Sequence, residues 1–128
     1  MFDTSLLAAM VAAVRVEIDN GGGAATLTFY TGTQPPAGGT ATGTVQAEVS
    51  LSTPCGDIAG TVLNLTVPIE TMRTGSQDIT WARLRRHDGS WLMDLTAGLT
   101  GSGAHLELDA LAGYPGGTIT LLSGAIGF

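Results

Sequence analysis

The chain contains no lysine, one cysteine and few charged side chains of either sign. All five basic residues are arginines and eleven residues are acidic, so the net charge at neutral pH is −6. A protein that follows the phosphate backbone of DNA or RNA needs a basic surface, so this balance argues against a nucleic-acid partner. The single cysteine, Cys55, excludes an intrachain disulfide and a zinc site built from cysteines.

A long hydrophobic run is also missing. The longest apolar stretch, residues 6–14, is too short to cross a bilayer, and no basic segment precedes it. We therefore expect no membrane partner and no export signal.

Charged residues make up only 12% of the chain, and its mean hydropathy is +0.29. Soluble domains usually carry about twice that share of charge. Two explanations remain open: a weakly polar surface rich in Thr and Gly, or an apolar surface that neighbouring subunits cover. The second explanation predicts a homo-oligomer, most simply a trimer, with a mainly apolar contact.

No combination of residues in the sequence is typical of a catalytic or metal site. His87 lies beside an expected turn and His105 on another expected strand, so neither has a spaced partner. Cys55 follows a proline and has no histidine at a motif distance, which favours a half-buried thiol. The eleven carboxylates form no calcium-loop pattern. The sequence therefore predicts that the protein is not an enzyme and that it holds no metal or cofactor.

The most determinate stretch, Asp78–Ala97, predicts a β-hairpin. Asp88-Gly89 is typical of a two-residue type I′ turn, because both central positions of that turn need positive φ. If the exposed Arg83–Asp94 ion pair is isolated, we expect it to contribute only about 0.2–1 kcal/mol. The expected cross-strand pairs are Arg86 with Trp91, Arg85 with Leu92, Leu84 with Met93, Arg83 with Asp94, Ala82 with Leu95, Trp81 with Thr96 and Thr80 with Ala97.

Trp81, Arg83 and Arg85 lie on one face of this hairpin and are candidate interface residues. An exposed aromatic ring beside planar donors suits a sugar or a peptide ligand. Burial of Trp81 under a second sheet is the other interpretation, and the sequence leaves both open.

Residues 3–18 predict a helix with Asp3 as its N-cap, ended by Asn20 and the glycines at 21–23. A sandwich of about seven strands can close its own core. We therefore expect the apolar side of the helix to be an attachment surface outside the core, or alternatively to cap one open end of the sandwich. The apolar positions at helical spacing, all candidate interface residues, are Leu7, Met10, Val11, Val14 and Ile18.

The rest of the chain alternates between short apolar-polar runs and turn signals. Expected strands cover residues 25–30, 44–51, 62–67, the hairpin, 104–109 and 118–126, whereas residues 31–43 form a loop, 52–60 a turn region and 70–77 a polar segment. This pattern predicts one mainly β domain over residues 1–128, with its helix at 3–18 and its strands within 25–128. The expected fold is an antiparallel β-sandwich or jelly roll of about seven strands with one N-terminal α-helix.

Several segments resemble small structural proteins that tailed bacteriophages and prophages encode. The resemblance is carried by residues 18–23, Leu27–Pro35, Thr80–Leu84, Asp88-Gly89, Leu92–Asp94 and Thr118–Thr120. It implies a non-enzymatic virion component.

Small sandwich or jelly-roll proteins of this kind commonly act as capsid decoration or cement proteins, often as trimers at the symmetry axes of the head. The resemblance therefore implies that the partners are the major capsid protein and further copies of this chain. It also implies synthesis in the cytoplasm of a bacterial host and a place on the virion head. The alternative is a tail, collar, baseplate or spike component that binds a host receptor or glycan.

Overall fold

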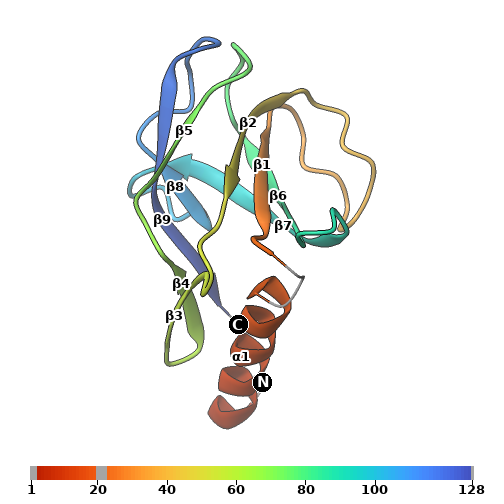
Figure 1. The fold of residues 1–128 in the computed structure, drawn as a ribbon, viewed down its shortest axis with the longest axis vertical. Helices are drawn as coiled ribbons and strands as arrows, with labels where there is room; N and C mark the ends of the chain where they lie inside the picture. The colour runs from red at the N-terminus through yellow and green to blue at the C-terminus, as the bar shows by residue number, and fades with distance from the viewer. Residues whose placement is uncertain (1–2, 20–22, 128) are drawn as a thin grey trace.

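The computed structural model describes residues 3–19 and 23–127. In this part of the chain, one helix and nine strands surround a hydrophobic core (Figure 1). The expected class, mainly β with one N-terminal helix, is confirmed. The elements are α1 (Thr4–Asp19), β1 (Thr26–Tyr30), β2 (Val45–Ser50), β3 (Gly56–Ala59), β4 (Val62–Leu65), β5 (Ile69–Met72), β6 (Trp81–Arg85), β7 (Trp91–Leu99), β8 (Leu106–Leu108) and β9 (Thr118–Gly127).

Two strands occur where the sequence analysis expected none. β3 lies in the turn region 52–60, and β5 overlaps the polar segment 70–77. Each has only four residues, which is too short a run to show a clear period of alternation. Both are specified by their neighbours instead, because β3 pairs with β4 and β5 pairs with β9.

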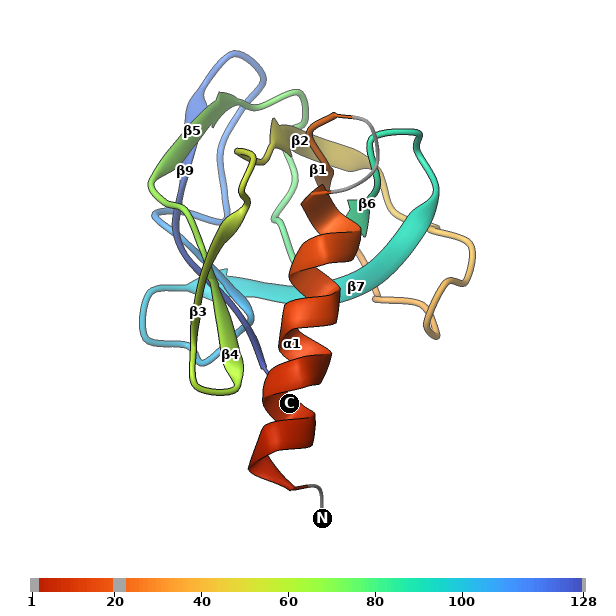
Figure 2. The ribbon, with the colours of Figure 1, turned by 60° about the horizontal axis from the view of Figure 1, so that its bottom comes forward.

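The strands form one continuous sheet in the order β2-β1-β6-β7-β8-β9-β4-β3, and β5 also pairs with β9. Two long strands make the sheet continuous. β7 pairs with β6 and then with β8. β9 pairs with β5, β8 and β4 along its length. The β7–β8 pairing is parallel, so the sheet is mixed. It curls until Ala47 of β2 meets Arg73, just after β5, in an isolated bridge (Figure 2). The sandwich-like enclosure is therefore one curled sheet instead of two antiparallel layers.

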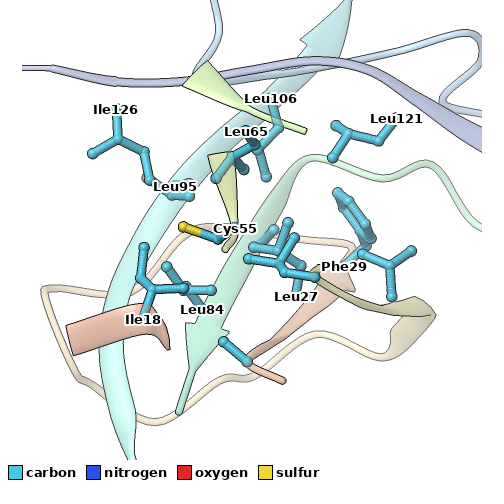
Figure 3. Close-up of a cluster of buried hydrophobic side chains, with 14 of the residues drawn as sticks. Ile18, Leu27, Phe29, Cys55, Leu65, Leu84, Leu95, Leu106, Leu121 and Ile126 are labelled. Carbon is cyan, nitrogen blue, oxygen red and sulfur yellow. The ribbon is translucent and has the colours of Figure 1, made fainter. Parts of the chain in front are cut away.

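Alternate residues of the strands point into the curled sheet. Leu27 of β1 pairs with Leu84 of β6, and Phe29 pairs with Ala82, so these inward side chains lie side by side. Figure 3 shows that Ile18 of α1 lies in the same cluster, together with side chains from β1, β4, β6, β7, β8 and β9. The core is thus built by the strands and the helix together.

The inner part of the β6–β7 hairpin has the expected register, but its tip differs. Four pairs form as predicted: Trp81 with Thr96, Ala82 with Leu95, Arg83 with Asp94 and Leu84 with Met93. Arg85, however, pairs with Trp91 and leaves Leu92 as an extra residue. The Arg86 amide donates to the Ser90 carbonyl (2.9 Å) and the Gly89 amide to the Arg86 carbonyl (2.9 Å). The two-residue turn was wrong: Gly89 has φ +89° and Asp88 does not have positive φ, as in a three-residue loop that ends in a glycine bulge.

Gly89→Val is expected to destabilise the protein by about 1–2 kcal/mol, because a β-branched residue resists the left-handed conformation. A Cβ atom at position 89 would meet nothing within 4 Å, so backbone strain is the whole effect. Gly89→Asn is the control, because asparagine tolerates positive φ and should cost less. Urea unfolding of the parent and the two variants measures the difference, and equal midpoints for the Gly89→Val and Gly89→Asn proteins would contradict this turn.

α1 begins as the sequence predicts. The Asp3 carbonyl accepts the first helical hydrogen bond from the Leu7 amide (3.0 Å), as an N-cap does. The expected helix end at Asn20 and the following glycines falls on residues 20–22, which lie outside the described residues. Residues 31–43 form an irregular connection between β1 and β2, as expected.

Candidate interaction surface

Trp81 is buried, with 1% of its surface exposed. One face of its ring stacks on Tyr30, with 4.6 Å between ring centroids and 15° between planes. The Arg83 guanidinium lies 5.3 Å from the centroid of the Trp81 ring. The exposed platform for a sugar or peptide is therefore wrong, and the interpretation of Trp81 as a buried residue is confirmed.

The loop of residues 31–43, and not a second sheet, is held against this face. Arg83 Nη2 donates to the Gly39 carbonyl (2.6 Å), and the Gly38 amide donates to Asp94 Oδ2 (3.3 Å). Arg83 Nε and Asp94 Oδ1 are 2.8 Å apart, and only 8% and 2% of the two side chains are exposed. The expectation of an exposed ion pair was therefore wrong, because the loop removes the pair from water.

Arg85 is also occupied by its own chain. Its guanidinium donates to Thr28 Oγ1 and to the Tyr30 hydroxyl, both at 3.1 Å. The three candidate interface residues of the hairpin, Trp81, Arg83 and Arg85, thus lie together. Their contacts are with one another, with β1 and with the loop of residues 31–43.

The environment of Asp94 lowers its pKa. Burial alone would raise this pKa, but hydrogen bonds from Arg83, Trp91 and the Gly38 amide, together with the charge of Arg83, outweigh burial. An aspartate in an unfolded chain has a pKa of about 3.9. Because the folded value lies lower, the group contributes stability that is fully present above that pH and is lost as the pH falls through the folded pKa.

Asp94→Asn is expected to destabilise the protein by about 1.5–3 kcal/mol at neutral pH and to flatten the loss of stability in acid. Asp57→Asn, at an exposed position of β3, is the control at neutral pH, where it should change the stability by less than about 0.5 kcal/mol. Urea unfolding at several pH values between neutral and strongly acidic conditions measures both effects. An Asp94→Asn protein with the acid dependence of the parent would show that the pair is not coupled to folding.

The helix candidates divide into two groups. Val11 and Ile18 are 0% and 1% exposed and belong to the core, and Val14 packs against it, whereas Leu7 and Met10 are half-buried. The expectation that the helix packs outside the core was therefore wrong for its second half. The curled sheet leaves one end open beside the β3–β4 hairpin, and α1 lies across that end (Figure 2).

Polar contacts fix this half of α1 in place. Asp19 Oδ1 accepts from the Cys55 amide (2.9 Å), and Glu17 pairs with Arg86 at the hairpin tip (3.2 Å). Cys55 itself is buried, and burial together with the nearby Asp19 carboxylate raises the pKa of its thiol to about 12. The thiol is therefore a core group in this structure.

The outward side of α1 carries a second apolar row that the sequence analysis missed. It consists of Leu6, Ala9, Ala13 and Val16, all exposed, with 47% of Leu6 and 55% of Val16 accessible. We call this row the outer stripe. Its spacing of three, four and three residues was visible in the sequence, but the stronger stripe on the opposite side masked it.

The first half of α1 also extends beyond the strands. In Figure 1 its N-terminal turns project past the β3–β4 hairpin at the bottom of the view. Leu6 and Ala9 belong to this first half of the helix, and both are exposed.

Two surface hollows are lined by residues other than Trp81, Arg83 and Arg85. One, of about 320 Å³, is lined by Thr44, Val45, Gln46 and residues 74–77. The other, of about 430 Å³, lies beside the outer stripe and is lined by Arg15, Val16, Asp19 and Pro54. Among the described residues, no group of three or more His, Cys, Asp or Glu side chains could hold a metal ion. No helix in residues 3–19 and 23–127 is long and apolar enough to cross a membrane.

Comparison with known proteins does not identify a family for the chain. No family model matches the chain, and searches of curated proteins and of solved structures found no significant match.

Proposed function

We propose that the chain is a structural protein of a tailed-bacteriophage virion, specifically a capsid decoration or cement protein. In this role it binds the outer surface formed by the major capsid protein and stabilises contacts between capsomers. The class comes from the resemblance of the segments between residues 18 and 120. α1 is proposed to carry one of the contacts of this assembly.

The observation that carries the proposal is the outer stripe. The side of a helix that faces away from a protein core is normally polar. Here that side presents Leu6 and Val16 at about half exposure, and residues 4–14 contain no charged side chain. An apolar row on a helix that is firmly held by its opposite side suits a rigid contact with another protein.

The competing role in a tail, collar, baseplate or spike depended on Trp81 as a ligand platform. The indole ring is stacked on Tyr30 and approached by Arg83, and it is 1% exposed. A sugar needs a free ring face, so the competing role has no support from this residue.

The copy number of the chain in purified particles tests the proposal. Quantitative mass spectrometry of particles from the phage or prophage that encodes the chain should find it in high copy, on the scale of the major capsid protein. A handful of copies per particle would instead indicate a tail or spike component, and absence from the particle would refute a virion role.

A further inference from the structure

We propose that the outer stripe of α1 is a self-association surface, which pairs in antiparallel orientation with the outer stripe of a second copy. The inference deepens the proposed function and rests on it for the place where two copies meet, namely the boundary between neighbouring capsomers.

The spacing of the outer stripe selects another helix as the partner. Leu6, Ala9, Ala13 and Val16 follow the intervals of three and four residues that form the apolar seam of a coiled coil. A seam of this kind is covered by a helix that carries the same intervals. In the described residues, the helix that carries these intervals is α1, so the matching partner is α1 of a second copy.

The order of side chains along the stripe is symmetric about position 11. Large residues stand at both ends and alanines stand between them. A twofold axis opposite position 11 sets Ala9 against Ala13 of the second copy and Leu6 against Val16 of the second copy. The alanines let the helices approach closely at the centre, and the larger side chains pack on either side.

Charge distribution favours the antiparallel orientation over the parallel one. No charge lies between Thr4 and Val14, so nothing repels where the helices cross. The net charge of −6 sits mostly on the β domain, which flanks the second half of α1. Antiparallel helices place the two acidic domains at opposite ends of the pair and oppose the helix dipoles, whereas parallel helices bring the domains to the same end.

The size of the contact sets its strength. The outer stripe is about 15 Å long at 1.5 Å per residue, so the contact belongs to the small interfaces that associate weakly. The dissociation constant in solution is therefore expected to lie roughly between the micromolar and the millimolar range. On a lattice that holds many copies side by side, the high local concentration makes the same contact effective.

Sedimentation equilibrium of the full chain, from micromolar to near-millimolar concentrations, should show a monomer–dimer equilibrium. Leu6→Glu should raise the dissociation constant by roughly tenfold or more, because it removes apolar burial and places an unpaired charge against Val16 of the other copy at each end of the contact. Leu99→Glu is the matched control, since Leu99 is 48% exposed on β7 and Leu6 is 47% exposed. A wild-type chain that stays monomeric at every concentration, or equal effects of the two variants, would overturn the proposal.

Cysteine cross-linking tests the orientation. A mixture of Ala9→Cys and Ala13→Cys proteins should form a disulfide-linked dimer, because those positions face each other across the axis. Each variant alone should cross-link poorly, since identical positions are displaced by about 6 Å along the helices and exceed disulfide reach. Efficient cross-linking of Ala9→Cys alone would indicate a parallel pair and overturn the inference. Cys55 stays buried and does not compete.

The outcomes separate this inference from the proposed function. A chain that decorates particles in high copy but neither dimerises nor cross-links would overturn the pairing and leave the virion role standing. A cross-linked antiparallel dimer of a chain that particles do not contain would support the pairing and refute the virion role.

Discussion

Arg73→Met is expected to destabilise the protein by about 3–5 kcal/mol. Arg73 is 2% exposed, and its guanidinium donates to the carbonyls of Leu111 (2.9 Å), Gly75 (3.3 Å) and Gln77 and to Gln46 Oε1 (3.3 Å). Neither ion pair of the described residues involves it. Methionine fills part of the space but donates no hydrogen bond, so four acceptors that the arginine serves lose a donor.

Arg73 lies where the curled sheet closes, so the loss of its hydrogen bonds affects the fold itself. Its backbone forms the bridge with Ala47 that closes the curled sheet, and its side chain ties residues 75–77 to the connection before β9. Arg86→Met is the control, because Arg86 forms a surface ion pair with Glu17 whose loss should cost about 1 kcal/mol or less. Urea unfolding measures both variants. Similar midpoints for the two would show that the buried guanidinium does not hold the closure together.

Removal of residues 1–19 is expected to yield an unfolded or aggregated protein. Val11 and Ile18 are fully buried, and each contributes about 1.5–3 kcal/mol through burial. Without α1 the open end of the curled sheet exposes Cys55 and the core leucines around it. A folded, soluble product with the circular dichroism of the β domain would contradict this account and make the helix a separate attachment element.

Point variants distinguish the contributions of the buried and the exposed side of α1 to stability without removing the helix. Ile18→Ala should destabilise the protein by about 2–5 kcal/mol, because it leaves a cavity in the core. Val16→Ala should change stability by less than about 0.5 kcal/mol, since the side chain is 55% exposed. Thermal unfolding of both proteins gives the comparison. A Val16→Ala protein as unstable as the Ile18→Ala protein would mean that the outward side of α1 is also packed.

The sequence predicted those parts of the fold that local pattern specifies. It predicted the strand at residues 25–30, and the expected pairs Leu84–Met93 and Arg83–Asp94 of the hairpin are present. The tip of the hairpin was wrong because Asp88-Gly89 fits both a two-residue turn and a three-residue loop with a bulge. Which one forms depends on how Trp91 and Leu92 pack, and a local signal does not contain that information.

Long-range packing decided the features that the sequence analysis missed. Nothing near residues 31–43 in the sequence indicates that Gly38 and Gly39 bind the Arg83–Asp94 pair. The burial of Val11 and Ile18 depends on the curl of the sheet, which leaves an end for the helix to close. The outer stripe could have been found, because its intervals stand in the sequence, but its exposure is known only once the opposite side is seen to be buried.

Occupancy of the chain on particles tests the central claim most directly, namely that the outer stripe of α1 attaches this protein within a virion. Particles assembled with the wild-type chain, the Leu6→Glu variant or the Leu99→Glu variant are purified, and the copies of the chain per particle are counted by quantitative mass spectrometry. The account predicts high and equal occupancy for the wild-type and Leu99→Glu proteins and a strong loss for Leu6→Glu. Full occupancy by a folded Leu6→Glu protein would contradict it.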